Sequence, residues 1–205
     1  MLMELLLVRH ALPLRVEGAS GAADPDLSDD GHAQAKHLAA YLRAEEVDAL
    51  YVSPLRRALQ TAAPVADAFG LDVTVVDGVA EYDRNSDTYI PAEEMRATNH
   101  PLWQALLSGE DVDGFEPRAE FHARVVASLE QLVVSHPGDR IVVVCHGGVI
   151  NAYLSHVLGL PLTAGFFYPK YTSIHRVIGA RSGERSISAV NEIAHLRGTG
   201  LPTGM

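Results

Sequence analysis

Short apolar runs bounded by polar or turn residues recur along the chain. They are Leu5–Val8, Leu50–Val52, Val73–Val76 and Ile141–Val144. Short runs that are rich in β-branched residues are typical of strands buried on both faces. The pattern therefore predicts four buried strands.

Segments with apolar residues at helical spacing lie between and after these runs. Ser28 is a residue type that caps the start of a helix, and the dipeptide Ser53-Pro54 has the types that open one. Gly70 is the type that commonly ends one. Helices are predicted over residues 29–42, 54–69, 92–107, 119–135 and 149–158.

Strands that alternate with helices predict an α/β fold, in which a mostly parallel sheet is covered on both faces. Two further apolar stretches, Ser173–Ala180 and Ser186–Val190, flank Ser182-Gly183 and predict a hairpin near the end.

The chain has the length of one well-buried domain, so a single domain over residues 1–205 is expected. The segment 82–118 is polar with isolated aromatic residues, too short for a domain, and fits a lid-like insert. Residues 198–205 are expected to form a loose tail.

The composition is ordinary for a globular protein, with 205 residues, 47% hydrophobic and 20% charged. No apolar run has the length of a membrane span, and no basic region precedes the first run, so neither a membrane partner nor a signal peptide is expected. The single cysteine, Cys145, excludes an internal disulfide and fits a cytoplasmic location. A net charge of −10 argues against nucleic acid as a partner.

Charged side chains and histidines follow the predicted strands. The candidates are Arg9, His10, Arg57, Glu81, His146 and Gly147. Ligands of open α/β sheets bind beyond the carboxyl ends of the strands. These residues are therefore expected to gather on one rim of the sheet.

This set of side chains has the chemistry of a phosphoryl-transfer site. Arginines match phosphate oxygens with forked donors, and a helix that opens at His146-Gly147 favours an anion. A neutral imidazole can attack phosphorus, and a carboxylic acid can protonate the departing oxygen. The arginines would supply the charge that a metal supplies elsewhere. The remaining histidines lack metal-ligand spacing, so neither a metal nor another cofactor is expected.

Five motifs carry a resemblance to a known family. They are "LVRHA", "LSDDGHAQA", "SPLRRALQTA", "AEY" and "CHGGVI", spread from Leu5 to about Leu158. Their order and approximate spacing resemble the histidine phosphatase superfamily, which includes cofactor-dependent phosphoglycerate mutases. The resemblance implies a three-layer α/β/α sandwich of the phosphoglycerate mutase-like kind.

The resemblance also implies a role for each candidate. His10 matches the nucleophile that becomes phosphohistidine, and Glu81 matches the usual proton donor. The residues that match phosphate contacts are Arg9, Arg57, His146 and, through its backbone N–H, Gly147. Arg56 is left as the arginine that faces solvent.

The sequence departs from the family pattern at several positions. Ala11 stands where the family usually has glycine, and only local crowding is expected unless the backbone needs positive φ. The asparagine that contacts phosphate in the mutase-like branch of the family has no counterpart after His10. Arg15 is a candidate to replace it, although a structural or solvated role is favoured for Arg15. The residues after Glu81 are atypical, which leaves Asp83 as an alternative acid. Asn151 stands where many relatives have a basic residue.

Some side chains are better explained by packing. Cys145 is expected to point into the core, because the loop after it closes on no arginine. The aromatic and sulfur-containing side chains of the insert are assigned to packing in preference to substrate contact; they are Tyr89, Met95, Trp103 and Phe115.

The function expected is hydrolysis of a small phosphate ester through phosphohistidine on His10. A phosphoglycerate mutase-type transfer is the first alternative, and a weakly catalytic module that binds a phosphorylated ligand is the second. The substrate stays open among sugar phosphates, nucleotides, phosphoglycerates and phosphoprotein. A homo-oligomer is allowed.

Overall fold

The computed structural model describes residues 1–108, 111–161 and 165–204. Within them six strands form one sheet in the order β3-β2-β4-β1-β5-β6. The strands are β1 (Leu2–Arg9), β2 (Ala49–Val52), β3 (Val73–Val75), β4 (Arg140–Cys145), β5 (Ile174–Ala180) and β6 (Arg185–Glu192). Strands β1 to β4 pair in parallel, whereas β5 and β6 join as an antiparallel hairpin. The predicted mostly parallel sheet and the hairpin are confirmed.

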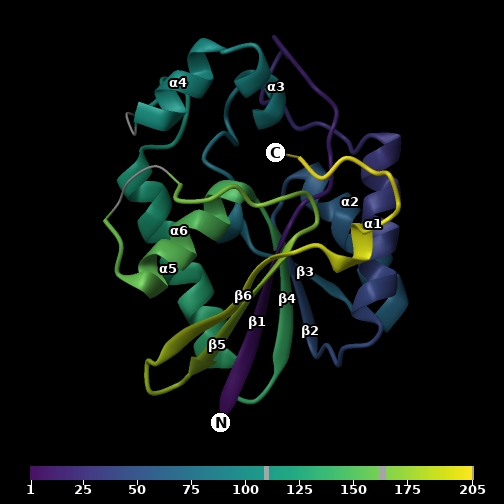
Figure 1. Cartoon of the computed structure of the whole chain (residues 1–205). Helices are drawn as coiled ribbons and strands as arrows, with labels where there is room; N and C mark the ends of the chain where they lie inside the picture. The colour runs from purple at the N-terminus through teal and green to yellow at the C-terminus, as the bar shows by residue number, and fades with distance from the viewer. Residues whose placement is uncertain (109–110, 162–164, 205) are drawn as a thin grey trace.

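Helices cover both faces of the sheet (Figure 1). They are α1 (Asp29–Leu42), α2 (Arg56–Phe69), α3 (Ala92–Ala97), α4 (Pro101–Ser108), α5 (Arg118–Ser135) and α6 (Gly147–Leu158). One apolar cluster joins the sheet to α1 and α2, and another joins it to α5 and α6. The fold is therefore the predicted three-layer α/β/α sandwich. In Figure 1, α3 and α4 lie beyond the carboxyl ends of the strands.

Strand β1 shows why its apolar run does not alternate with polar residues. Leu5 and Leu7 pack in the cluster with α5 and α6, whereas Leu6 and Val8 pack in the cluster with α1 and α2. A strand that is covered on both faces needs apolar side chains at every position. The run then ends at Arg9, where the sheet ends.

The third predicted strand is not buried. Val73 and Val75 of β3 are 37% and 53% exposed. Strand β3 lies at the edge of the sheet and pairs only with β2. The apolar run predicted the strand correctly, but its composition did not distinguish an edge from an interior position.

The helix starts agree with the sequence in part. The Ser28 side chain accepts from the Gly31 N–H at 3.1 Å and caps α1, as predicted. Helix α2 begins later than expected, at Arg56, with Leu55 in extended backbone as its N-cap. Gly70 ends α2 with φ +63°, a conformation that favours glycine.

The helix predicted over 92–107 is instead two helices, α3 and α4. Asn99 between them has φ +50°, and Pro101 follows. Asparagine tolerates the left-handed conformation better than most residues, and proline lacks the N–H that would continue a helix. The helices predicted over 119–135 and 149–158 are confirmed as α5 and α6, with slightly earlier starts.

The prediction of a loose C-terminal tail is wrong for the described residues. The Pro202 carbonyl accepts from the Gln34 side chain, and the Thr203 carbonyl accepts from the Tyr171 N–H at 3.0 Å. These two contacts hold the segment against α1 and against the loop before β5.

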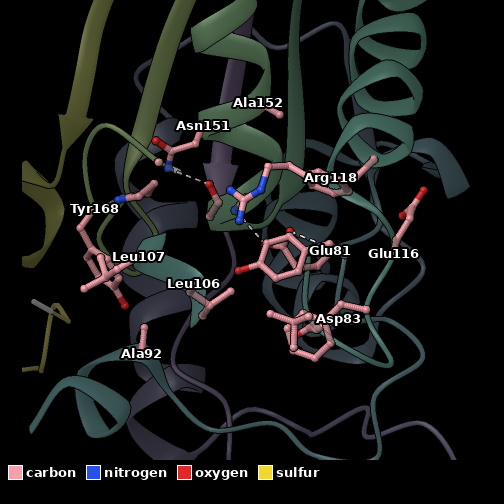
Figure 2. Close-up of a pocket in the computed structure, with 18 of the residues that line it drawn as sticks. Glu81, Asp83, Ala92, Leu106, Leu107, Glu116, Arg118, Asn151, Ala152 and Tyr168 are labelled. Carbon is pink, nitrogen blue, oxygen red and sulfur yellow. Dashed lines mark hydrogen bonds between the residues drawn. The ribbon is translucent and has the colours of Figure 1, made fainter. Parts of the chain in front are cut away.

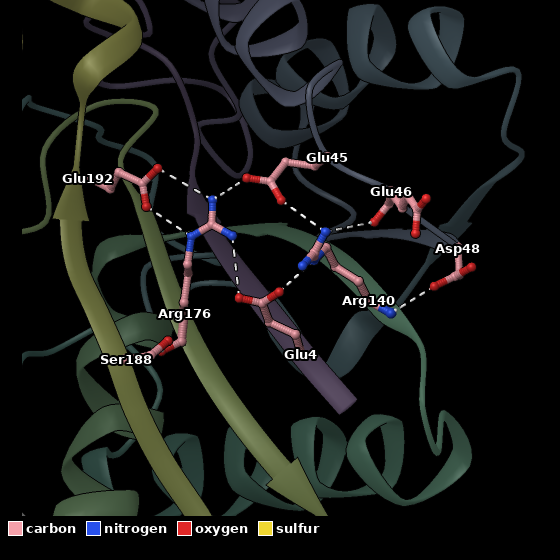
Figure 3. A network of polar contacts seen from close by, with 8 residues as sticks. All are labelled: Glu4, Glu45, Glu46, Asp48, Arg140, Arg176, Ser188 and Glu192. Atoms are coloured by element: carbon pink, nitrogen blue, oxygen red, sulfur yellow. Dashed lines mark hydrogen bonds and ion pairs between the residues drawn. The ribbon is translucent and has the colours of Figure 1, made fainter. Parts of the chain in front are cut away.

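An ion-pair network joins four strands of the sheet and the loop after α1 (Figure 3). Arg176 pairs with Glu45 at 2.7 Å and with Glu192 at 2.9 Å, and it also reaches Glu4. Arg140 pairs with Glu4 and Glu45. Two arginines and three glutamates thereby connect β1, β4, β5, β6 and the loop after α1.

None of the described helices is long and apolar enough to cross a bilayer.

Candidate active site

The parallel pairing of β1 with β4 brings two distant histidines together. Arg9 is paired with Cys145 across the ladder, and the His10 N–H donates to the Cys145 carbonyl at 2.9 Å. The rings of His10 and His146 follow these strands, and their centroids lie 5.1 Å apart. The predicted gathering of both histidines at one rim is therefore present.

His10 is 3% exposed, and its Nδ1 lies 2.7 Å from the Ala11 carbonyl oxygen. Because a carbonyl only accepts, Nδ1 carries the hydrogen, and a neutral ring then has its lone pair on Nε2. Burial lowers the pKa of His10 well below its usual value, and the charges of Arg57 and Arg9 lower it further. His10 is thus held as a neutral imidazole with a free nucleophilic nitrogen.

Arg9 and Arg57 are also buried, at 5% and 1% exposed. Arg9 donates from Nη1 to the Pro169 carbonyl at 2.7 Å. Its guanidinium carbon lies 4.2 Å from the Tyr171 ring centroid and 4.9 Å from that of Tyr168. These contacts leave the Arg9 Nε without a hydrogen-bond partner among the described residues.

Arg57 is fixed from two sides. Its Nη2 donates to Asp83 at 3.1 Å, and its guanidinium lies over the Tyr89 ring at 4.6 Å. Its Nε, like that of Arg9, has no hydrogen-bond partner in the part of the chain that the structure describes. Two oriented guanidinium groups with an unused donor each suit a tetrahedral oxyanion.

His146 is completely buried and precedes the first turn of α6. Its Nε2 lies 2.6 Å from the Ser53 hydroxyl, and burial, with Arg57 second, lowers its pKa well below the usual value. Ser53 Oγ accepts from the Leu55 N–H and still has its own hydrogen to donate to Nε2. With the hydroxyl as the donor, the ring hydrogen is on His146 Nδ1, which has no partner among the described residues. His146 stands beside His10 but is not part of the cavity wall, whereas Gly147 is.

Glu81 follows a short 3-10 helix, Asp77–Val79, and is 7% exposed. Its Oε2 accepts from the Gly148 N–H at 2.8 Å. Burial, together with the nearby Asp83 charge, raises the pKa of Glu81 to about 7. A carboxyl group with that pKa exchanges a proton readily at neutral pH.

Asp83, the alternative acid, has a different environment. It is bound to Arg57 in an ion pair, so its carboxylate serves to orient the arginine. Of the two carboxyl groups, the geometry therefore favours Glu81 as the proton donor.

These groups form one end of a cavity of about 270 Å³. Arg9, His10, Arg57, Glu81 and Gly147 all line it. The insert supplies much of the remaining wall, and Figure 2 shows Leu106 and Leu107 of α4 on the side away from Glu116. The side chains assigned to packing line the cavity as well; they are Tyr89, Met95, Trp103 and Phe115.

Arg15 is not part of the site. It is absent from the cavity wall and pairs on the surface with Glu17 at 2.6 Å and Glu94 at 3.0 Å. The role of Arg15 as a substitute phosphate contact is therefore wrong, and its surface ion pairs agree with the favoured structural or solvated role. Arg56 faces solvent as expected and pairs with Asp26 at 2.6 Å.

Two other expectations are confirmed. Ala11 does not adopt positive φ, and its N–H donates to the Thr61 hydroxyl at 2.9 Å, so the methyl group is accommodated. Cys145 is fully buried in the core, where burial raises the pKa of its thiol. Asn151 lines the cavity and donates to the Gly147 and Phe167 carbonyls at 3.0 and 3.1 Å.

The sequence analysis missed an aromatic support for Arg9. Tyr168 and Tyr171 lie against the guanidinium, and both hydroxyls donate to Glu93 of α3, at 3.1 and 2.8 Å. Next to Tyr171, Thr172 has φ +53°, an unusual value for a β-branched residue. The run "FFYPKY" at 166–171 concentrates aromatic residues and was the available signal.

The described residues contain no group of three or more histidine, cysteine, aspartate or glutamate side chains placed to hold a metal ion. The positive charge of the site comes from Arg9 and Arg57, whose guanidinium groups are held by tyrosine rings and by hydrogen bonds.

Known proteins with similar sequences are consistent with this site. The chain is 30% identical over 200 residues to phosphoserine phosphatase 1 of Hydrogenobacter thermophilus, which covers 95% of each chain. It is also 30% identical over 174 residues to a probable phosphoglycerate mutase of Enterobacter sp., covering 80% of this chain and 78% of that protein.

The fold has close solved counterparts. A crystal structure of a phosphoserine phosphatase variant from Entamoeba histolytica, in complex with phosphoserine, has a TM-score of 0.75 and 25% identity, and covers 95% of this chain and 99% of that one. The sequence profile of the histidine phosphatase superfamily (branch 1) matches residues 5–193. With that match across nearly the whole chain, and with the paired histidines and buried arginines at the sheet rim, this protein belongs to the histidine phosphatase superfamily.

Proposed function

We propose that this protein is a phosphomonoesterase that hydrolyses a small phosphate ester through a covalent phosphohistidine on His10. One observation carries the proposal. A neutral imidazole with a free Nε2 and a carboxyl group with a pKa of about 7 line the same cavity as two buried arginines. The similarity to a protein named phosphoserine phosphatase supports hydrolysis.

In the first step, Nε2 of His10 attacks phosphorus in line with the ester oxygen. The N–P bond forms as the P–O bond to the alcohol breaks, and Glu81 gives its proton to the departing oxygen. Arg9 and Arg57 hold the equatorial oxygens and stabilise the charge that they carry. The N–H of Gly147, which lines the cavity, is a further donor for these oxygens, and the His146 ring lies beside the nucleophile with 5.1 Å between the two ring centroids.

In the second step, water attacks the phosphohistidine. Glu81, now a carboxylate, removes a proton from that water, the N–P bond breaks, and inorganic phosphate is released. His10 returns to its neutral form, because its buried position between arginines disfavours a second proton. The reaction needs no metal, since the arginines supply the stabilising charge.

The covalent step is tested by mixing the protein with a ³²P-labelled ester and stopping the reaction rapidly without acid. We expect a label on the protein that survives alkali, is lost in acid, and is absent from His10→Ala. A wild-type protein that turns over ester without ever carrying such a label would falsify the covalent mechanism.

The mutase alternative has support from the similarity to a probable phosphoglycerate mutase. Isomerisation of 3-phosphoglycerate in the presence of 2,3-bisphosphoglycerate, at a rate above that of phosphate release, would favour it. The binding-module alternative loses its basis, because Ala11 is unstrained and Glu81 is held at the site by Gly148.

We further propose a cytoplasmic location, which fits the single, buried cysteine. The expected partner is the small phosphorylated substrate, with neither nucleic acid nor membrane involved, and a homo-oligomer is open to measurement by light scattering.

A further inference from the structure

The cavity has two chemically different ends. At one end lie the histidine, the arginines and Glu81 that the proposed function uses. Arg118, His122, Asn151 and Ser155 are polar residues of the remaining wall. Its larger, apolar part comes from the insert, α5 and the loop before β5. Its side chains are Ile90, Met95, Trp103, Leu106, Leu107, Val112, Phe115, Phe121 and Phe167.

Helix α4 gives the clearest sign of what this apolar end binds. Its sequence is PLWQALLS, yet none of its residues is buried. Trp103, Leu106 and Leu107 all line the cavity, and Leu107 remains 54% exposed. A helix in a globular protein usually packs its apolar stripe against the core. Here the apolar stripe of α4 faces the cavity, so a bound ligand would cover these side chains as core residues do in other helices.

The acidic side chains of the wall already have partners. Glu116 pairs with Arg124, and Asp83 pairs with Arg57. Asp111 accepts from the Arg118 N–H at 2.9 Å. An ammonium group on the substrate would therefore have to compete with contacts inside the protein.

The size of the cavity limits the substrate further. At about 270 Å³ it lies just below the range of about 300–1,000 Å³ that is common for small-molecule sites. A phosphoryl group with a short chain or a single ring fits such a volume, whereas a folded phosphoprotein does not.

We propose that the substrate is a small phosphomonoester whose alcohol carries an apolar body, either an alkyl chain or one aromatic ring. Trp103 and Leu106 of α4, with Phe115 and Phe167, bind that body while the phosphoryl group lies at His10. This inference rests on the proposed function for its chemistry but concerns the other end of the cavity.

Turnover of a series of primary alkyl phosphates tests the proposal. Ethyl, butyl, hexyl and 2-phenylethyl phosphate are compared with phosphoserine by release of inorganic phosphate. The leaving alcohols of the alkyl series have similar acidity, so differences report binding of the body. We expect kcat/KM to rise roughly three- to fourfold per methylene group until the cavity is filled. A flat series, or a preference for phosphoserine over butyl phosphate, overturns the inference.

A matched pair of variants locates the effect. Leu106→Ala should lower the ratio of hexyl to ethyl phosphate kcat/KM by about fivefold to tenfold. Leu158→Ala makes the same change on α6, at a side chain that is 52% exposed and outside the cavity wall, and should leave the ratio unchanged. An unchanged ratio in Leu106→Ala contradicts the assigned location.

Binding separates this inference from the proposed function. Calorimetry of hexyl and ethyl phosphate with His10→Ala measures preference without turnover. If the wild type hydrolyses none of the esters, the proposed function fails, and a tighter Kd for hexyl phosphate still supports the apolar site. Equal Kd values for the two esters overturn the inference whether or not turnover occurs.

Discussion

Gly148 and Glu81 are fitted to one another at the site. The Gly148 N–H donates to Glu81 Oε2 at 2.8 Å, and a Cβ at position 148 would lie 2.2 Å from Oε1 of the same carboxyl group. The same Cβ would meet the Tyr82 ring at 2.5 Å. Only glycine leaves room for a carboxyl group this close to the start of α6.

Gly148→Ala should therefore displace Glu81 and impair proton transfer. We expect kcat/KM for alkyl phosphates to fall about 10²-fold, the lower end of the usual contribution of a general acid. Gly21→Ala is the control, because a Cβ there meets nothing within 4 Å. Steady-state phosphate release measures both, and full activity in Gly148→Ala would show that Glu81 is not the acid.

The pH dependence follows from the opposite shifts of two groups. Glu81 must be protonated to act as an acid, and its pKa of about 7 means that kcat/KM for alkyl phosphates should fall above neutral pH. His10 must be neutral, and its lowered pKa removes the loss of activity expected below pH 6.5 for an ordinary histidine. The pH profile of kcat/KM measures both effects, and Glu81→Gln should remove the fall at high pH along with most of the activity.

Glu81 should also affect stability. Its pKa in the folded protein is above the ordinary 4.5, so the folded state binds more protons than the unfolded state between pH 4.5 and about 7. Stability is then fully present below the ordinary pKa and is lost as pH rises through the folded value. Glu81→Gln should be more stable than the wild type at pH 8, on the order of 1–3 kcal/mol, with little difference at pH 4. Urea denaturation at the two pH values measures this, and a variant that is less stable at pH 8 contradicts it.

The aromatic support of Arg9 predicts a graded effect at Tyr171. Tyr171→Phe keeps the ring 4.2 Å from the guanidinium and removes only the hydroxyl that donates to Glu93, so a small change is expected. Tyr171→Leu removes the ring, and kcat/KM should fall by about threefold to thirtyfold through a higher KM, as expected for a lost cation–π contact. Equal losses in both variants would assign the effect to the hydroxyl.

The ion-pair network of Arg140 and Arg176, whose residues are outside the cavity wall, should govern stability without touching catalysis. Arg176→Ala leaves three glutamates without that partner, and its side chain is only 13% exposed. We expect a loss of about 1–3 kcal/mol at pH 7, less than the 3–5 kcal/mol of a fully buried pair. Arg15→Ala breaks only exposed ion pairs and should cost at most about 1 kcal/mol. Thermal unfolding measures both variants, and kcat/KM should match the wild type in each.

The sequence predicted the parts of the site that lie next to strand ends. Two apolar runs that are buried on both faces end at Arg9, His10 and His146. Runs of this kind are typical of the interior strands of a sheet, which fixes where the residues after them lie. The family motif was needed to choose Arg57, because Arg56 next to it is also an arginine and yet faces solvent. The acid was ambiguous until the structure placed Asp83 against Arg57.

What could not be predicted depends on contacts between distant segments. Arg9 rests on the Pro169 carbonyl and on Tyr171, far downstream, and no local pattern links them. The break between α3 and α4, in contrast, had a local signal, because Pro101 lacks the N–H that would continue a helix. The exposure of Val75 could not be predicted either. Strand β3 lies at the edge of the sheet, and the order of the strands is a property of the folded structure that its local sequence does not contain.

The anchoring of the last residues has a practical consequence for anyone who handles the protein. Thr203 is hydrogen-bonded to the backbone of Tyr171, whereas Met1 is 92% exposed at the end of β1 remote from the histidines. A purification tag or a fluorescent label attached at the C-terminal end would begin close to the anchored segment that carries Tyr171, one of the rings against Arg9. The same attachment before Met1 would begin at an exposed residue away from the site, so that end is the one to choose.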